Sequence, residues 1–225
     1  MHLDALKTKI EPQFYEVLDG LGIKELRPSQ EKSIDAGLFD GENLLVCTPT
    51  ASGKTLVAEL AMIDGILKRK GKAIYIVPLK ALATEKYKEM KQRYGHLLKV
   101  GVSIGDLDSA DPYIAQNDLI FCTSEKLDSL IRHRAEWLKD VATVVVDEGH
   151  LLNDASRGPT LEILLTILRD LLKNVQIIAL SATIGNPNDL ADWLEAKLVE
   201  DKWRPVELHQ GVLLEDKIEF KKRKS

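Results

Sequence analysis

The stretch LLVCTPTASGKTLVAELAMIDGIL, residues 44–67, decides the fold of this chain. Its apolar beginning predicts a β-strand over Asn43–Thr48, and the loop that follows contains Gly53. Beyond the loop, apolar residues recur at the spacing of one helix face and predict a helix over Lys54–Lys70, which ends on basic residues before Gly71. The stretch therefore predicts a strand, a loop and a helix in direct succession.

Short apolar strands and longer amphipathic helices alternate along the chain from about residue 42 onward. The further predicted strands are Lys72–Pro78, Val100–Ile104, Asp118–Thr123, Val141–Asp147 and Gln176–Ser181. The further predicted helices are Ala81–Tyr94, Lys126–Leu138, Thr160–Leu172 and Pro187–Ala196. Most of the strands are too uniformly apolar to have one face in water. The sequence therefore predicts an α/β fold, with a mostly parallel central β-sheet flanked by helices on both faces.

The two ends of the chain lie outside this repeating pattern. Helices are predicted over Phe14–Leu21 and Pro28–Phe39, and they form a helical preface of residues 1–40 before the main domain of residues 41–225. Near the other end, strands are expected over Val206–Leu208 and Val212–Leu214. The charged residues that follow, Lys217–Ser225, indicate a solvated terminus.

Composition excludes several classes of protein. Of the 225 residues 44% are apolar, which is enough for a full core, and the formal net charge of -4 lacks the basic excess of many non-specific nucleic-acid binders. Cys47 and Cys122 lie in strand-like apolar runs, which predicts buried thiols. The N-terminus is unlike a signal peptide and no apolar run has the length of a membrane span, so we expect a cytoplasmic protein with no membrane partner.

The loop between the first strand and its helix has the features of a phosphate-binding site. It consists of Thr48, Pro49, Thr50, Ala51, Ser52, Gly53, Lys54 and Thr55. Backbone N–H groups of such a loop can surround a phosphate, Lys54 can reach its β- and γ-oxygens, and the Thr55 hydroxyl can bind Mg²⁺. Because Thr48 stands where the strict pattern has glycine, a chance Gly-Lys-Thr sequence at a helix start is the alternative interpretation.

Two adjacent carboxylates follow a later strand. Asp147 and Glu148 come at the carboxyl end of the apolar run Val144–Val146, the edge at which ligands of open α/β sheets bind. Asp147 can hold Mg²⁺ largely through water, and Glu148 can polarise a water molecule that attacks a γ-phosphate. An Asp-Glu pair after a strand is also a common helix-entry signal, which is the alternative here.

The order of these motifs resembles that of DExH-box superfamily 2 helicases. The resemblance rests on Gln30, the loop of residues 48–55, Asp147-Glu148-Gly149-His150 and Ser181-Ala182-Thr183, and it covers nearly the whole chain. The segments Leu26–Gln30, Pro49–Thr55, Pro78–Ala83 and Ser181–Asn186 look most like the superkiller-type branch, whose archaeal members are 3′-to-5′ DNA repair helicases. This branch tolerates a residue other than glycine at position 48. Gly149 departs from the Ile, Val, Cys or Ala that such boxes usually have.

The resemblance implies a RecA-like domain with ATP and Mg²⁺ as cofactors, and it assigns roles to further residues. Gln30 would read the adenine edge, and the alternative is a glutamine on an exposed helix face. Three segments would hold a nucleic-acid backbone, and they consist of Pro78, Leu79, Lys80 and Ala81; Thr123, Ser124, Glu125 and Lys126; and Gly105 and Asp106. Helix capping by Thr123 and a simple Gly-Asp turn are the structural alternatives.

The same resemblance implies partners that this chain lacks. Ser181, Ala182, Thr183 and His150 would link hydrolysis to domain movement. A second RecA-like domain of the parent protein would supply arginines to the transferring phosphate, so we expect this chain to bind MgATP or MgADP but not to unwind single-stranded or forked DNA, or RNA. A small-molecule P-loop kinase and a non-catalytic nucleic-acid clamp are the competing classes.

Overall fold

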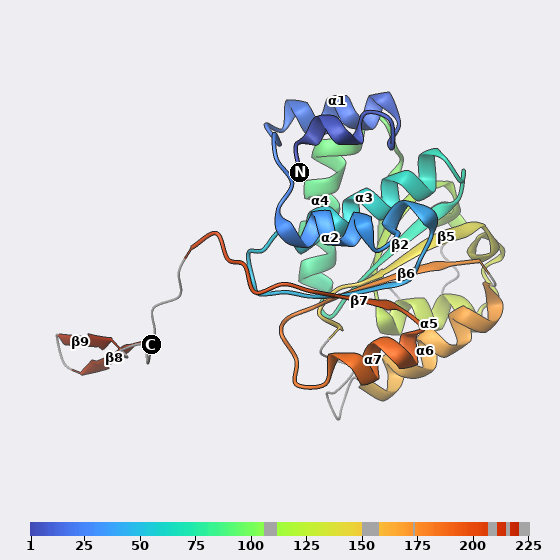
Figure 1. Cartoon of the computed structure of the whole chain (residues 1–225). Coiled ribbons are helices and arrows are strands. Elements are labelled where there is room, and N and C mark those ends of the chain that lie inside the picture. The colour runs from blue at the N-terminus through green and yellow to red at the C-terminus, as the bar shows by residue number, and fades with distance from the viewer. Residues whose placement is uncertain (106–111, 150–157, 173, 207–210, 215–216, 221–225) are drawn as a thin grey trace.

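A seven-stranded sheet runs through the centre of the molecule (Figure 1). The computed structural model describes residues 1–105, 112–149, 158–172, 174–206, 211–214 and 217–220. The strands are β1 (Leu44–Cys47), β2 (Lys72–Val77), β3 (Val100–Ser103), β4 (Leu119–Thr123), β5 (Val141–Val146), β6 (Gln176–Ser181) and β7 (Lys197–Glu200). Their order in the sheet is β3-β4-β2-β5-β6-β1-β7, and every pairing is parallel. The predicted α/β fold is confirmed.

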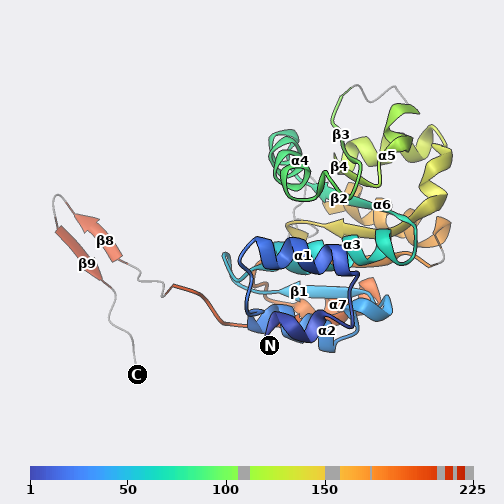
Figure 2. The same ribbon diagram turned by 90° about the horizontal axis from the view of Figure 1, so that it is seen from above.

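Helices cover both faces of this sheet (Figures 1 and 2). One face carries α1 (Pro12–Gly20), α2 (Pro28–Asp35), α3 (Lys54–Leu67) and α4 (Lys80–Tyr94). The other face carries α5 (Ser124–Arg132), α6 (Gly158–Leu171) and α7 (Pro187–Leu194). Short 3-10 helices occur at Leu3–Leu6 (η1), Leu38–Asp40 (η2), Pro112–Gln116 (η3) and Glu136–Asp140 (η4). Among the described ranges, none of the helices combines the length and apolar character that a bilayer span requires.

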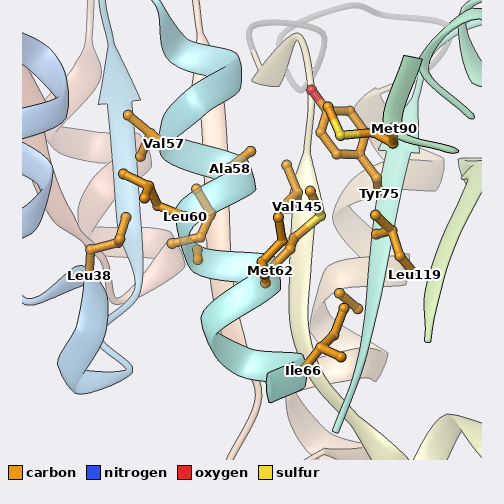
Figure 3. Close-up of a cluster of buried hydrophobic side chains, with 14 of the residues drawn as sticks. Leu38, Val57, Ala58, Leu60, Met62, Ile66, Tyr75, Met90, Leu119 and Val145 are labelled. Atoms are coloured by element: carbon orange, nitrogen blue, oxygen red, sulfur yellow. The ribbon is translucent and has the colours of Figure 1, made fainter. Parts of the chain in front are cut away.

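Alternate residues of every strand of the central sheet except β3 enter two separate hydrophobic cores. In β1, Leu44 and Val46 join the core under α3, whereas Leu45 and Cys47 join the core on the opposite face. Figure 3 shows the first core, in which side chains of α3 meet Tyr75 of β2 and Val145 of β5. Burial of both strand faces accounts for the uniformly apolar runs in the sequence. The prediction of buried cysteines is confirmed, because Cys47 and Cys122 are both buried. Their burial raises the pKa of the Cys47 thiol to about 11 and that of Cys122 to about 12.

Two predicted helices end several residues early, and one strand was not predicted. The helix expected over Lys126–Leu138 ends at Arg132, because Arg134 takes a left-handed backbone conformation (φ 52°) and the chain continues as η4. The helix expected over Pro28–Phe39 ends at Asp35, ahead of Gly37 (φ 101°) and η2. Strand β7 was not predicted, since it pairs only with β1 at the sheet edge and half of its residues are exposed.

The C-terminal part forms a hairpin that lies apart from the central sheet in both views (Figures 1 and 2). Strands β8 (Gly211–Leu214) and β9 (Lys217–Phe220) pair in antiparallel fashion. Residues Lys217–Phe220 thus form a strand within the charged terminus, and the solvation expected for that terminus stays a prediction. Of the strand expected over Val206–Leu208, Val206 is an exposed bend residue, and the other two positions lie outside the described residues.

Candidate functional site

The predicted phosphate loop joins β1 to α3 with two residues in left-handed conformations. Ala51 has a φ of 64° and Gly53 a φ of 96°. The backbone conformation of Gly53 favours glycine, and a Cβ atom added there would lie 2.4 Å from Nε2 of Gln30 and would displace that amide. Lys54 is the first residue of α3, and its amine donates to the carbonyl oxygens of Thr48 (2.7 Å) and Pro49 (3.3 Å). The amine therefore lies inside the curve of the loop.

Thr48 closes the base of this loop. Its side chain is fully buried, and its hydroxyl lies 2.7 Å from the hydroxyl of Ser52. Its backbone N–H donates to the carbonyl of Ser181, the last residue of β6 (3.2 Å). A glycine at position 48 could not make the hydroxyl contact. The departure from the strict pattern thus introduces a hydrogen bond across the loop.

The N-terminal end of α2 holds three successive carbonyl groups of the loop. Arg27 donates from Nη1 to the Ala51 carbonyl (2.6 Å), and Ser29 donates from its hydroxyl to the Ser52 carbonyl (3.4 Å). Gln30 donates from Nε2 to Gly53 (3.0 Å) and accepts from the N–H of Arg27 at Oε1 (2.8 Å). Gln30 is 3% exposed, so the alternative of a glutamine on an exposed helix face is wrong. Adenine contact stays a prediction, because here both ends of the amide bond the chain itself.

A cavity of about 470 Å³ borders the loop next to α2. Gln30, Gly53 and Thr55 line one part of it, and Glu59 and Arg93 line another. Glu59 is buried and accepts hydrogen bonds from Tyr94 and from Arg93 (2.8 Å). The wall away from the loop is therefore a connected polar network rather than loose surface side chains.

The carboxylate pair follows β5, which is separated from β1 by β6 alone. Asp147 follows β5, accepts from the Tyr75 hydroxyl at Oδ2 (2.8 Å), and accepts from the N–H of Glu148 at Oδ1 (2.9 Å). Burial lowers the pKa of Lys54 below its ordinary value, and the negative charges of Glu148 and Asp147 oppose that change. Burial, together with the charge of Asp147, raises the pKa of Tyr75 well above its ordinary value, so its hydroxyl remains a donor. The loop amine and both carboxylates thus act on one another electrostatically.

The segments predicted to contact a nucleic-acid backbone follow three neighbouring strands. Pro78–Ala81 follows β2 and begins α4, Thr123–Lys126 ends β4 and begins α5, and Gly105 comes two residues after β3. Thr123 caps α5 by accepting from the N–H of Lys126 (3.4 Å), as the structural alternative proposed, and Lys126 is 1% exposed. Asp106 lies outside the described residues. The sheet order brings the segments to one edge, and their predicted role remains a prediction.

The predicted coupling segment lies beside the phosphate loop. Ser181 ends β6 in parallel register with Cys47 of β1, and Ala182 and Thr183 follow it. His150 lies outside the described residues. Gly149 has room for a larger residue, because an added Cβ atom would meet the Leu180 carbonyl oxygen at 3.4 Å, an ordinary contact.

Two side chains at the site were missed by the sequence analysis. Tyr75 was read only as part of an apolar strand, although its place opposite Val145 in the β2–β5 register puts it near Asp147. Arg27 was read only as part of a motif around Gln30, although it reaches the loop 24 residues away. For Tyr75, the available signal was a tyrosine among aliphatic residues of a strand. For Arg27, no local signal indicated the contact.

The family model for the DEAD/DEAH box helicases matches residues 27–190, most of the chain. The chain belongs to the DEAD/DEAH box helicase family. The resemblance drawn from the motifs is confirmed. Membership of this family implies nucleotide binding.

Curated relatives and solved structures agree with this membership. The chain is 50% identical over 211 residues to "ATP-dependent DNA helicase Hel308" of Methanococcus vannielii, which covers 91% of this chain and 28% of that protein. It is 53% identical over 212 residues to the Hel308 protein of Methanocaldococcus jannaschii, covering 91% and 18%. A crystal structure of the DUF1998 helicase MrfA bound to DNA and AMPPNP matches with a TM-score of 0.73 and 27% identity, covering 86% of this chain and 29% of that one. The chain thus spans less than a third of these relatives.

Proposed function

We propose that this chain is the ATP-binding first motor domain of an ATP-dependent DNA helicase. The observation that carries the proposal is the position of Lys54, whose amine lies inside the loop and donates to the Thr48 and Pro49 carbonyls. A site with a cation on one side and two carboxylates on the other suits a polyphosphate with a bound Mg²⁺. The names of the relatives support ATP as the nucleotide and DNA as the polymer.

Each residue of the site has a role in this proposal. Lys54 would hold the β- and γ-phosphate oxygens together with the backbone N–H groups of Thr50–Gly53. Thr55 and Asp147 would hold Mg²⁺ largely through water, and the ion would neutralise charge on the phosphates. Tyr75 keeps one oxygen of Asp147 engaged and so orients that carboxylate. Glu148 would accept a proton from the attacking water molecule.

The helical preface and the segments predicted to contact a nucleic-acid backbone complete the proposed motor. Residues 1–40 would present Gln30 to adenine, and residues 41–225 would form the RecA-like domain. Pro78–Ala81, Gly105 and Thr123–Lys126 would hold phosphates of single-stranded or forked DNA, since they follow adjacent strands at one sheet edge. Ser181–Thr183 and His150 would pass the state of the nucleotide to a second RecA-like domain in the parent protein.

Calorimetric titration of the purified chain with MgADP tests the nucleotide site. The unaltered chain is expected to bind, and Lys54→Ala is expected to weaken binding by about tenfold to a hundredfold, because a charged hydrogen-bond donor is lost. Lys88→Ala, which removes an exposed lysine from α4, is the matched control. Equal binding by the unaltered chain and Lys54→Ala would contradict the phosphate-loop assignment.

An unwinding assay tests the proposal that the motor is incomplete. The chain alone is expected to separate no strands of a forked DNA, because the arginines that stabilise the transferring phosphate are expected on another domain. Robust ATP-dependent unwinding by the 225-residue chain would contradict this part of the proposal.

A further inference from the structure

The segment that leaves β7 does not run directly to the hairpin but is held against α2. The carboxylate of Asp201, whose side chain is 9% exposed, pairs with the amine of Lys32 at 2.8 Å. The same amine donates to the carbonyl of Glu200 (2.9 Å). The other oxygen of Asp201 accepts from the N–H of Trp203 (2.6 Å). Asp201 thus fixes both the departure of the chain from the sheet and the position of Trp203.

Trp203 in turn lies against Arg27, which donates a hydrogen bond to the phosphate loop. Its ring is 5.5 Å from the guanidinium carbon of Arg27, within the range of a cation–π interaction. Nη1 of that guanidinium donates to the carbonyl of Ala51 at 2.6 Å. Ala51 is one of the two left-handed residues of the loop. A single side chain therefore contacts both the loop and the segment by which the chain leaves the domain.

The next residue of the segment also approaches the nucleotide site. Burial is the main reason that the pKa of Lys54 lies below its ordinary value, and the positive charge of Arg204 contributes in the same direction. Arg204 is exposed and follows Trp203 directly. The course of the segment past the loop thus adds positive charge where the proposed site takes phosphates.

We propose that Trp203 is a positioning residue of the nucleotide site, which links the shape of the phosphate loop to the path of residues 201–204 through Arg27. The proposal rests on the nucleotide binding proposed above. A change in the Ala51 carbonyl when phosphates enter the loop would move the Arg27 guanidinium, and the ring that lies against it would change its surroundings. In the reverse direction, loss of the Trp203 ring would leave the Arg27 side chain less firmly held, and nucleotide binding would become weaker.

Tryptophan fluorescence can report on this link directly, because the chain has three tryptophans. Replacing the other two by Trp137→Phe and Trp193→Phe leaves Trp203 as the only tryptophan. Addition of MgADP is expected to change its emission with the same midpoint as the calorimetric titration. In this background, Arg27→Ala is expected to make Trp203 more accessible to acrylamide quenching without nucleotide, whereas Lys88→Ala is expected to have no effect.

Affinity measurements complete the test. Trp203→Ala is expected to weaken MgADP binding by about two- to fivefold, whereas Trp203→Phe, which keeps an aromatic face, should lose less than about twofold. In an Arg27→Ala background, Trp203→Ala should cost nothing further. If the unaltered chain binds MgADP while Trp203→Ala binds equally well and Trp203 emission does not respond, the positioning role is overturned and the proposed function stands. If the unaltered chain does not bind MgADP, the proposed function is overturned first.

Discussion

Two polar networks at opposite edges of the sheet have similar hydrogen-bonding groups but are expected to serve different purposes. At the carboxyl edge, Arg27, Ser29 and Gln30 donate to carbonyl groups of the phosphate loop. At the amino edge, Gln176 of β6 donates to the carbonyls of Leu38 (2.7 Å) and Glu42 (3.0 Å) and accepts from Arg69 (2.8 Å). In both networks a side-chain amide donates to backbone carbonyls between strands and helices. The guanidinium of Arg27 also donates to a carbonyl, whereas that of Arg69 donates to side chains.

The two networks differ in what surrounds them. Gln176 is fully buried, and Arg69 also donates to Thr143 (2.8 Å) across a contact so close that a Cβ atom at Gly65 would lie 2.5 Å from the Thr143 hydroxyl oxygen. Gln30 instead lines the cavity of about 470 Å³ beside the phosphate loop. Both guanidinium groups reach the surface, since Arg27 is partly exposed and Arg69 is exposed, so the two networks differ in the place of the amide. An amide that is fully buried can only stabilise the fold, whereas one that lines a cavity can exchange its hydrogen bonds with a ligand. Four substitutions test this comparison.

The largest effect is expected from Gln176→Leu. The buried Leu38 carbonyl, the part-buried Glu42 carbonyl and one donor of Arg69 would lose their partner, so the free energy of unfolding should fall by about 2–4 kcal/mol in urea denaturation. Affinity for MgADP should stay within about twofold of the unaltered chain under native conditions. Gln92→Leu on the exposed side of α4 is the control. A large loss of affinity at full stability would break the distinction between the two networks.

Gly53→Ala should alter the carboxyl-edge network and reduce nucleotide affinity more than it reduces stability, the opposite of Gln176→Leu. An alanine at φ 96° is strained by about 1–2 kcal/mol, and its Cβ atom would displace the Gln30 amide. We expect MgADP affinity to fall by about tenfold or more, with a smaller loss of unfolding free energy than in Gln176→Leu. Calorimetry and urea denaturation measure the two quantities on the same preparation. Unchanged affinity would show that the loop binds no phosphate in this conformation.

Gln30→Ala separates the support of the loop from recognition of the base. If the amide exchanges its bonds with adenine, MgADP should bind about tenfold more weakly while MgGDP changes by less than about twofold. The measurement is a pair of calorimetric titrations with the two nucleotides. An equal loss for both would mean that Gln30 only holds the Gly53 carbonyl.

Gly149→Ala should have the smallest effect, although position 149 lies next to the carboxylates. Its Cβ atom would make an ordinary contact of 3.4 Å with the Leu180 carbonyl oxygen. We expect a gain in unfolding free energy of up to about 1 kcal/mol, because alanine reduces the freedom of the unfolded chain. MgADP affinity should not change. A loss of affinity would indicate that the backbone after Glu148 needs the freedom of glycine when nucleotide binds.

The elements that local sequence predicted well are those with strong periodicity or a specific loop. Gln176–Ser181 is a strand at the predicted bounds, and α3 begins at the predicted Lys54. The prediction failed where a local backbone conformation or an edge position decided the outcome. Arg134 ends a helical pattern that its residue type does not interrupt, and β7 gains its stability from pairing with β1 rather than from an apolar pattern of its own.

The sequence by itself determined the strand–loop–helix unit, the residues of the phosphate loop, the acidic pair and the parallel character of the sheet. These features depend on residues that are neighbours in the chain, so spacing is enough to reveal them. Only the tertiary structure decided which distant residues meet. Tyr75 and Asp147 are 72 residues apart, and the contacts of Arg27 with Ala51 and with Trp203 join three separate segments. Such contacts follow from the order β2-β5-β6-β1-β7 in the sheet, and that order results from the packing of both faces at once rather than from any local preference.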